Sequence, residues 1–514
     1  MSNSMKPRQR GRAAAAIGVC ILVATLTACG GDGEALSGRR VGSMHNDSAR
    51  IARVERGLLP TVAVRGRNDP TYLFDNRMRH YGVPGVSISV IDGRRVAWER
   101  AYGTTEAGGA QRVDATTLFQ AGSISKAITA VAALHFVDRG FLQLDEDVNL
   151  RLVGWKVPQS ELTHDRPVTL RGLLSHGAGL NIPSFRGYGA GAPLPTLLQV
   201  LQGAPPANTP PVRVEHAPGT QWSYSGGGLS VVQQLLIDVS SRPFADILQE
   251  TVFDRAGMTR TVAEQPLSAA HSTSAATGHS SGAPVPGRWR VHPEVAAAGL
   301  WSTAEDLGRF GVAVLRAIGG ERDALLRPAT ASELITRQIG DWGLGFALGG
   351  GTIVGGDSPA VGHDGSTAGY AARLLVLPTT GQGIAIMTNG ESEALIDEIT
   401  RAVAQEYSWP VRPRIEKSIA AVDPAGYAAL AGNYGVELGD RMVGFVVGVD
   451  GSGDGRRLII TGPSGRPAEL LPLSALHFFS QDTGNEFTFT REGNAVSSML
   501  IDQQGQRFTA HRMR

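Results

Sequence analysis

Cysteine and lysine are both scarce in this sequence of 514 residues, and each scarcity excludes a kind of chemistry. The two cysteines lie within the first 30 residues, so we expect no disulfide framework in the body of the protein. The sequence contains neither a His-Glu-x-x-His stretch nor a paired-cysteine cluster, and it predicts no metal site and no cofactor. Because arginine keeps its proton, a basic amine must come from one of the three lysines beyond the N-terminal segment. These are Lys126, Lys156 and Lys417.

Strong charge and long apolar runs are also missing. The formal net charge is +1 and no basic run follows the N-terminal segment, so the sequence does not favour nucleic-acid binding. After residue 25 no apolar stretch is long enough for a transmembrane helix. These absences argue against a nucleic-acid-binding protein and against a transmembrane helix beyond the N-terminal segment.

The first 30 residues have the pattern of a bacterial lipoprotein leader. Four positive residues precede an apolar run over residues 13–25, which is typical of a secretion signal and is too short to span a bilayer. The run ends with Leu-Thr-Ala before Cys29, which resembles a lipobox, so we expect a signal peptide over residues 1–28 and acylation of Cys29. The alternative is an ordinary signal peptide with an incidental cysteine. Removal of the four charged residues turns the net charge of +1 into −3; they are Lys6, Arg8, Arg10 and Arg12.

This leader predicts where the protein resides. An acylated Cys29 leaves no free thiol and attaches the chain to the bacterial cell envelope through lipid alone. Gly30 beside it favours the periplasmic face of the outer membrane, if the cell has two membranes. Residues 29–48 are rich in Gly, Ser, Asp and Asn, and we expect them to form a tether.

The next domain, residues 49–410, has strand patterns at both ends. Alternating residues around an Asp-Gly turn predict a β-hairpin over residues 85–98, and strand patterns return at 371–377 and 383–388. Helical patterns and long Gly/Pro loops fill the region between them. This order predicts an α/β (α+β) fold, in which helices flank an antiparallel sheet that carries an inserted, mostly helical region. A cleft is expected where the two parts join.

The C-terminal part of the chain has a different pattern. Residues 411–424 are expected to be a linker, and residues 425–514 contain short alternating runs separated by glycines. These runs predict a small all-β domain, a barrel or a sandwich. It contains no cluster of catalytic residue types, so we expect an accessory role.

One predicted helix carries a candidate nucleophile and a candidate base. Apolar residues at helical spacing follow Ser123, and Lys126 lies one turn along the same face. A serine is a weak nucleophile until a neighbouring base takes its proton, and a desolvated lysine can do so. Ser125 is the competing nucleophile, but its position turns it away from Lys126. The alternative is a chance Ser-x-x-Lys pair on a solvated helix.

Two later stretches offer further candidates. Tyr224 precedes a glycine-rich turn into a helix predicted over residues 229–239, so it can enter a cleft as a phenol or a phenolate, or else be an ordinary core tyrosine. His363 lies near the start of a small-residue strand, which can supply a backbone N–H to an oxyanion. Most of the twelve histidines are expected to be surface or core residues. His176, in a Ser-His-Gly turn, is predicted to be a turn residue with satisfied hydrogen bonds.

Taken in order, three motifs resemble those of the serine β-lactamase and penicillin-binding-protein superfamily, most closely its class C β-lactamase-like branch with esterases and D-amino-acid peptidases. The resemblance covers roughly residues 50–410, and the stretches 168–180 and 293–306 support it. The trailing β domain is similar to a barrel-like extension of some members. The motifs are Ser123-x-x-Lys126, Tyr224-Ser-Gly226 and His363-Asp-Gly365.

The resemblance implies a role for each residue. Ser123 would be the acylated nucleophile, Lys126 its base, and Tyr224 the group that relays the proton and later helps to activate water. The backbone N–H groups of Ser123 and Ser366 would form the oxyanion hole. His363, within the motif that ends at Gly365, would stand where lactamases usually have a lysine. The implied mechanism uses no metal and no cofactor.

Two departures from the family pattern bear on the substrate. Gly226 replaces the usual asparagine, and His363 replaces the lysine that pairs with a substrate carboxylate. Histidine is mostly neutral near pH 7, so the second change weakens the positive charge that would pair with a carboxylate. Together the two changes favour an ester or an amino-terminal D-residue amide as the substrate. A true class C-type β-lactamase or a D-amino-acid peptidase is the alternative within the enzymes. A non-catalytic envelope binding or sensor protein is the alternative from another class.

Overall fold

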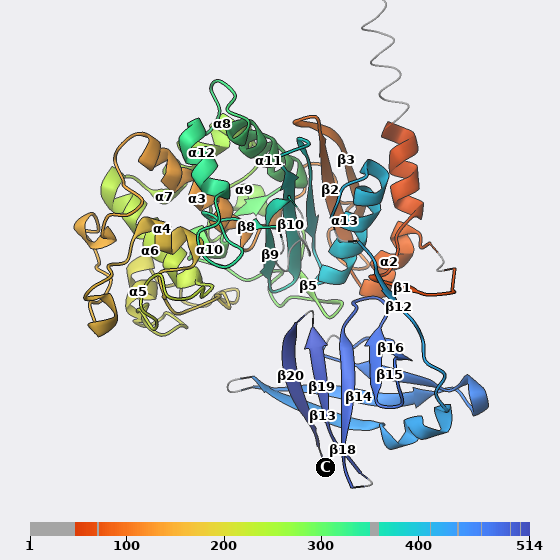
Figure 1. The fold of residues 1–514 in the computed structure, drawn as a ribbon. Helices are drawn as coiled ribbons and strands as arrows, with labels where there is room; N and C mark the ends of the chain where they lie inside the picture. The colour runs from red at the N-terminus through yellow and green to blue at the C-terminus, as the bar shows by residue number, and fades with distance from the viewer. Residues whose placement is uncertain are drawn as a thin grey trace, which may run out of the picture. The chain divides into compact units, whose positions relative to one another are not determined.

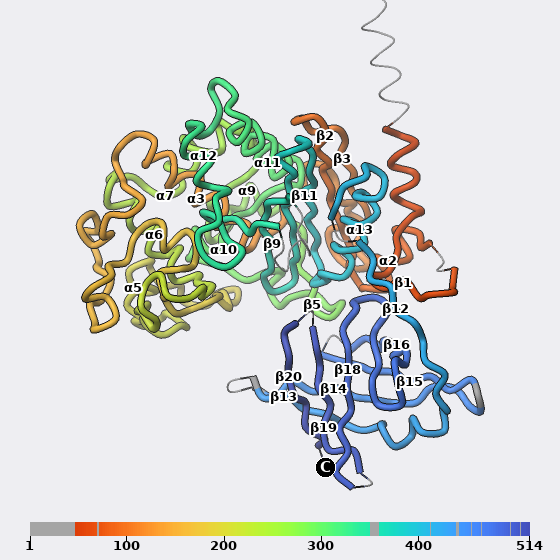
Figure 2. The backbone as a smooth tube through the Cα atoms, viewed as in Figure 1, coloured from red at the N-terminus to blue at the C-terminus, as the bar shows by residue number. Residues whose placement is uncertain are grey.

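The computed structural model describes residues 47–68, 71–349, 359–411, 413–438, 441–463, 465–493, 495–503 and 505–513 (Figures 1 and 2). The predicted signal peptide, Cys29 and nearly all of the predicted tether lie outside this range. Within it, no helix combines the length and the apolar character needed to cross a bilayer.

A six-stranded antiparallel sheet is the centre of the main domain. Its strand order is β3-β2-β11-β10-β9-β8, so the first hairpin of the domain pairs with its last one through β2 and β11. The predicted hairpin and the two predicted later strands are confirmed, as is the antiparallel sheet with a helical region inserted between them. The strands are β2 (Gly85–Asp92), β3 (Arg95–Gly103), β8 (Ala347–Leu348), β9 (Val361–Thr367), β10 (Tyr370–Leu377) and β11 (Gln382–Thr388).

Helices cover both faces of this sheet (Figure 1). On β10, Leu374 and Val376 pack in one core with α11 (Ala304–Ile318), whereas Leu375 and Leu377 pack in a second core with α13 (Glu393–Tyr407). Alternate strand residues point to opposite faces, so a strand that is apolar throughout buries both of them. The helix α2 (Phe74–Tyr81) belongs to the second core.

The inserted region is built from short helices around α3 (Ile124–Asp138) and α6 (Gly226–Ser240). The helix α6 begins three residues before the predicted start at 229. Ser225 caps it by accepting a hydrogen bond from Gly228 N at 2.9 Å, so the predicted glycine-rich turn is the first turn of the helix. The other α-helices and the π-helical turn of this region are α4 (Leu170–Ser175), α5 (Leu197–Gln202), α7 (Phe244–Leu248), the π-helical turn (Gln249–Phe253), α8 (Asp254–Ala256), α9 (Ala269–Ser272), α10 (Val295–Ala298) and α12 (Pro328–Ile335).

The C-terminal domain is a closed barrel of eight antiparallel strands, which resolves the predicted choice between barrel and sandwich. Buried aromatic rings fill its interior, among them Tyr434, Phe478 and Phe489. The centroid of the Phe489 ring lies 5.8 Å from that of Tyr434 and 5.8 Å from that of Phe478. Its strands are β13 (Gly432–Leu438), β14 (Arg441–Asp450), β15 (Arg457–Thr461), β16 (Pro467–Pro472), β17 (His477–Ser480), β18 (Glu486–Glu492), β19 (Ala495–Gln503) and β20 (Gln506–Arg512).

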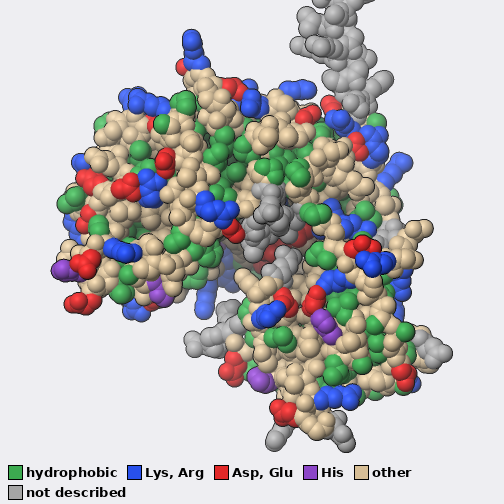
Figure 3. Space-filling model, in the orientation of Figure 1, with side chains coloured by type: hydrophobic (Ala, Val, Ile, Leu, Met, Phe, Trp, Pro, Cys, Tyr) green, Lys and Arg blue, Asp and Glu red, His purple; other side chains and the backbone are tan. Residues whose placement is uncertain are grey.

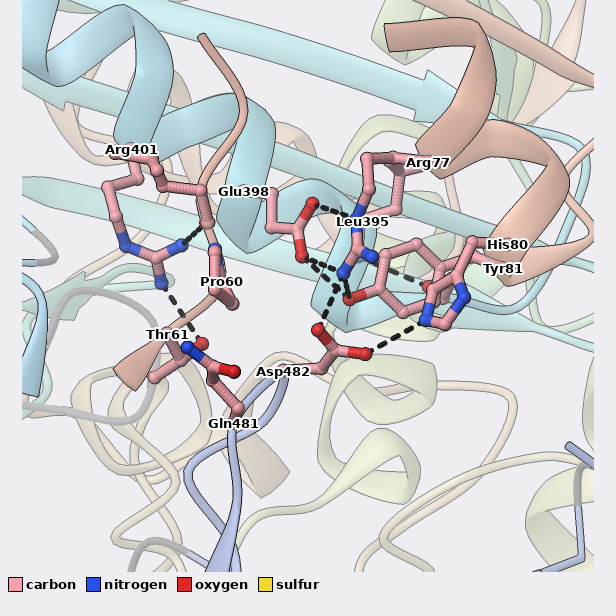
Figure 4. A network of polar contacts seen from close by, with 12 residues as sticks. Pro60, Thr61, Arg77, His80, Tyr81, Leu395, Glu398, Arg401, Gln481 and Asp482 are labelled. Carbon is pink, nitrogen blue, oxygen red and sulfur yellow. Dashed lines mark hydrogen bonds and ion pairs between the residues drawn. The ribbon is translucent and has the colours of Figure 1, made fainter. Parts of the chain in front are cut away.

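Buried charges connect the barrel with the main domain (Figure 4). Arg77 on α2 donates to Glu398 on α13 at 2.7 Å and to Asp482, in the β17–β18 turn, at 2.7 Å. His80 lies 2.8 Å from the other oxygen of Asp482. Nearby, β1 (Val62–Val64) pairs in parallel with β12 (Ile415–Lys417), so the segment predicted as a linker contains a strand.

Candidate active site

The start of α3 brings a hydroxyl and an amine together. Ser123 occupies the N-cap position, and Lys126 Nζ lies 3.0 Å from Ser123 Oγ. Lys126 Nζ also donates to the carbonyl oxygen of Ala297 on α10 at 2.7 Å. The lysine side chain is almost fully enclosed, at 2% exposure. The predicted pair therefore exists as a contact between two side chains on one helical face.

Burial changes the acid–base character of this lysine. Removal from water disfavours the ammonium ion and lowers the pKa of Lys126 to about 7, from 10.5. A neutral amine can keep its N–H bond to the Ala297 carbonyl while its lone pair faces the Ser123 hydroxyl. The competing Ser125 is buried, and its Oγ accepts a hydrogen bond from Leu300 N at 3.2 Å, which gives it a structural contact.

Tyr224 joins the pair from the residue before the α6 cap. Its ring centroid lies 5.0 Å from Lys126 Nζ, and its hydroxyl interacts with the Ser123 side chain. Burial raises the pKa of Tyr224, although the hydrogen bond with Ser123 opposes this change. Of the two predicted forms, the structure therefore favours the neutral phenol at pH 7, which can donate a proton and accept one.

The strand β9 passes close to the nucleophile because two glycines allow it. A Cβ on Gly122, whose φ is +53°, would lie 2.7 Å from Ser366 N. A Cβ on Gly365 would lie 2.0 Å from the carbonyl oxygen of Ala121. Larger residues at either position would push the strand away. The backbone of Ser366 therefore runs beside the residue that precedes Ser123, as an oxyanion hole requires.

His363 lies in the same strand, and the structure gives it one free nitrogen. Its Nδ1 lies 2.6 Å from the carbonyl oxygen of Asp364, so this nitrogen carries the proton and donates it. Its Nε2 is buried and has no hydrogen-bond partner among the described residues. Burial, together with the nearby Lys126, lowers the pKa of His363 to about 3. His363 is therefore a neutral hydrogen-bond acceptor, and it has no cationic charge to offer a carboxylate.

An aromatic cluster beside Tyr224 was not predicted from the sequence. His176 ends α4 with a positive φ of 61°, as a turn residue does, and its Nδ1 accepts from Ser225 N at 3.1 Å. The expectation that it is fully satisfied is wrong, because its buried Nε2 has no partner among the described residues. Its ring lies against Tyr224 and Trp342, with centroids 4.4 and 4.8 Å away.

Trp222 completes this cluster and is partly open to solvent. Its ring stacks on Trp342 with centroids 5.9 Å apart and an interplanar angle of 27°, and it lies 6.2 Å from the ring of Tyr224. The residue is 41% exposed. Its position two residues before Tyr224 was the one available signal, whereas nothing in the sequence connects position 342 with the site.

The described residues contain no group of three or more His, Cys, Asp or Glu side chains arranged to hold a metal ion. The candidate residues supply a hydroxyl, an amine whose pKa is lowered to about 7, a phenol and backbone N–H groups.

Comparisons with known proteins show the family and the fold. A family model described as Beta-lactamase matches residues 72–407. Penicillin-binding protein 4 of Amycolatopsis lactamdurans is 28% identical over 392 residues, which cover 71% of this chain and 97% of that protein. Unguisins hydrolase ungD of Aspergillus violaceofuscus is 24% identical over 352 residues, which cover 61% of this chain and 59% of that protein. The octameric penicillin-binding protein homologue from Pyrococcus abyssi shares the fold, with a TM-score of 0.56 at 20% identity over 85% of this chain and 98% of its own.

Proposed function

The chain belongs to the beta-lactamase family of serine hydrolases, and from this premise we propose that it hydrolyses an ester or an amide through an acyl-enzyme. One observation carries the proposal: Lys126 Nζ, buried and with a pKa of about 7, lies 3.0 Å from Ser123 Oγ. Such an amine accepts the serine proton near neutral pH. The class C-like branch named from the motifs stays a prediction.

The first half of the reaction transfers the acyl group to the enzyme. Ser123 gives its proton to Lys126 Nζ as Oγ attacks the carbonyl carbon, and the carbonyl oxygen becomes an oxyanion. The backbone N–H groups of Ser123 and Ser366 stabilise this charge. When the tetrahedral intermediate collapses, the leaving oxygen or nitrogen takes a proton that Tyr224 relays from Lys126. The ester left on Ser123 is the acyl-enzyme.

Water completes the cycle. Tyr224 and Lys126 take a proton from the water molecule as it attacks the acyl carbon, and Ser123 Oγ recovers a proton as it leaves. The carboxylic acid is released and the enzyme returns to its starting state. A buried phenol suits this role because it begins each step protonated and returns to that form.

The surroundings of the site favour a substrate without an obligatory carboxylate. His363 is buried and neutral, and Gly226 offers no side-chain amide. The exposed edge of Trp222 and the stacked Trp342 supply apolar surface instead. These features support a carboxylic ester, or the amide of an amino-terminal D-residue, with an apolar group next to the reacting carbonyl.

Family membership favours β-lactamase or D-amino-acid peptidase activity as the second candidate. To separate the two, turnover of short-chain nitrophenyl esters is compared with turnover of a chromogenic cephalosporin, and the ester is expected to be faster. A fluorophosphonate probe should add its mass to Ser123. A folded protein whose Ser123 is never labelled would favour the non-catalytic binding or sensor alternative, especially if a ligand binds without turnover.

The predicted envelope location is proposed on the sequence pattern alone. Expression of the full chain in a bacterium fed labelled palmitate should label the protein, and Cys29→Ser should abolish the label and release the protein from the membrane fraction. Labelling that survives this substitution would contradict the lipid anchor.

A further inference from the structure

Two buried histidines lie beside Tyr224, and the reaction steps described above use neither of them. Few histidine side chains are visible on the face of the molecule that Figure 3 shows. His176 and His363 are enclosed instead, at 2% and 3% exposure. Their ring centroids lie 4.4 and 6.3 Å from that of Tyr224, and both rings pack edge-on against Trp342, at 4.8 and 5.3 Å. Two histidines from distant parts of the chain therefore share the same two aromatic neighbours.

Local hydrogen bonds fix the tautomer of each imidazole ring. The backbone N–H of Ser225 donates to His176 Nδ1, so the proton of this neutral ring is on Nε2. His363 has the opposite arrangement, because its Nδ1 lies 2.6 Å from the carbonyl oxygen of Asp364 and must donate to it. Burial, together with the nearby Lys126, lowers the pKa of both histidines, so both rings are neutral at pH 7. His176 Nε2 is therefore a donor, and His363 Nε2 is an acceptor.

Neither of these Nε2 atoms has a hydrogen-bond partner among the described residues, and both are buried. An unpaired donor or acceptor in the interior is costly, and folded proteins contain few of them. Here one donor and one acceptor lie around a single side chain, Tyr224, whose hydroxyl interacts with Ser123. This arrangement matches a ligand group that accepts one hydrogen bond and donates another.

We propose that His176 and His363 bind the water molecule that deacylates Ser123, with His176 as the donor and His363 as the acceptor. The inference rests on the proposed acyl-enzyme function and names its acyl acceptor. A water molecule has two O–H groups and two lone pairs. His176 Nε2–H occupies one lone pair, and one O–H group donates to His363 Nε2. The second O–H group remains for the relay through Tyr224 and Lys126, and the second lone pair remains for the acyl carbon.

The bonds of the deacylation step balance with water alone. The O–H bond that faces Tyr224 breaks, and its proton passes to the relay as the water oxygen bonds to the acyl carbon. Ser123 Oγ then leaves and takes a proton from the relay. The hydrogen that is bonded to His363 stays on the oxygen and ends on the released carboxylic acid.

Other acyl acceptors fit this pair of histidines less well. An alcohol has one O–H group, so either the relay or His363 would lack a hydrogen-bond donor. A neutral amine has one lone pair, which it needs for the attack, so the N–H of His176 would stay unpaired. A site that leaves a buried polar group unpaired discriminates against the ligand that does so. The pair therefore favours hydrolysis over transfer of the acyl group to an alcohol or an amine.

Asparagine and glutamine separate the roles of the two ring nitrogens. The amide of asparagine reaches the place of Nδ1, whereas that of glutamine reaches the place of Nε2. His363→Asn keeps the donor to Asp364 but loses the acceptor, and with a nitrophenyl ester we expect it to slow deacylation by about tenfold to a hundredfold. The acylation burst should remain, and His363→Gln should recover part of the loss. His216→Asn, at an exposed histidine, is the control.

The same comparison at His176 tests the donor. His176→Asn keeps an acceptor for Ser225 N and removes the N–H group at the ε position, whereas His176→Gln keeps that N–H group. We expect slower deacylation in the asparagine variant, with partial recovery in the glutamine variant. Melting temperatures of all four variants separate a loss of fold from a loss of water binding. If one histidine proves essential for folding, the pair of variants at the other decides.

Competition between acyl acceptors identifies the occupant. Ethanol and glycinamide are added during ester turnover, and acid, ethyl ester and amide products are measured. Per mole of acceptor, the wild type should form less ester and amide than acid, and the asparagine variants should raise this ratio at least about tenfold. Preferred transfer to ethanol or glycinamide by the wild type would overturn water as the occupant. Equal effects of asparagine and glutamine at both histidines would overturn the role of the Nε2 atoms. A wild type that never carries an acyl group on Ser123 would instead overturn the proposed function itself.

Discussion

Lys126 Nζ lies 3.0 Å from Ser123 Oγ, and the same nitrogen donates to the backbone of Ala297, which comes from a distant part of the chain. The first contact follows from helical spacing, and the second helps to keep the amine buried. Because burial lowers the pKa of Lys126 to about 7, the amine is both within hydrogen-bonding distance of the serine hydroxyl and a base of suitable strength. Several testable properties of the protein depend on this relationship.

Ester hydrolysis should rise with pH and level off with a midpoint near pH 7. Only the neutral amine of Lys126 can take the serine proton, so kcat/KM follows the deprotonated fraction. If Lys126 had its ordinary pKa of 10.5, the rise of kcat/KM with pH would continue into strongly alkaline solution. The check is kcat/KM for a neutral nitrophenyl ester measured from about pH 5 to about pH 9. A rate that is flat through this range would contradict the assignment of the base.

Stability should also depend on this lysine. The folded pKa is depressed, so the unfolded state binds more protons between about pH 7 and pH 10.5, and stability rises with pH in this window. Lys126→Met removes the cost of a buried amine and should raise the free energy of unfolding at pH 7 by a few kcal/mol, on the order of 1.4 per pKa unit. Urea denaturation measures this change. The control is Lys156→Met, which removes an exposed amine that donates to the carbonyl oxygens of Asn149 and Leu152; because it relieves no burial cost, it should not raise the free energy of unfolding.

Tyr224→Phe should lower kcat by about 10²–10⁴ because the proton relay is lost. The ring that packs on His176 is retained, so KM and the melting temperature should change little. Steady-state kinetics and burst amplitudes separate acylation from deacylation in this variant.

Ser125→Ala is a matched control for the nucleophile and should keep most of the activity, whereas Ser123→Ala should abolish labelling by a fluorophosphonate.

Trp222→Ala should raise KM for esters with an aromatic or long apolar group by about tenfold, because burial of an aromatic side chain at such a contact is worth roughly 1–3 kcal/mol. The residue is 41% exposed, so the fold should survive. The acetyl ester, which cannot reach the indole, serves as the internal control, and Trp222→Phe should restore part of the affinity. An equal loss for both esters would indicate a general distortion of the site.

Glu398→Gln should destabilise the protein by about 3–5 kcal/mol, because Arg77 would keep its charge while losing a buried ionic partner. Asp482→Asn, at the more exposed end of the same network (Figure 4), should cost less and should loosen the barrel first. Hydrogen exchange of barrel amides, compared with amides of the central sheet, checks this order. Equal changes in both regions would show that the network does not hold the barrel specifically.

Local patterns determined much of the fold. Period-two alternation around an Asp-Gly turn predicted the hairpin β2–β3, and strand patterns predicted β10 and β11. Period 3.6 placed Ser123 and Lys126 on one face of α3. Both periodic patterns depend only on residues close together along the chain, so they can be recognised without knowledge of the fold. The order of elements then limited the main domain to an antiparallel sheet with a helical insertion.

The tertiary structure decided what these residues can do. Pairing of β2 with β11 joins strands almost three hundred residues apart. Packing of α6 and β9 against α3 brings Tyr224 and His363 close to Lys126 and Ser123. Burial by segments distant in sequence sets three properties of the site: the lowered pKa of Lys126, the acceptor nitrogen of His363 and the contact of Trp342 with Tyr224. A sequence names the ionisable groups, but desolvation and long-range contacts set their protonation, and these exist only once the chain has folded.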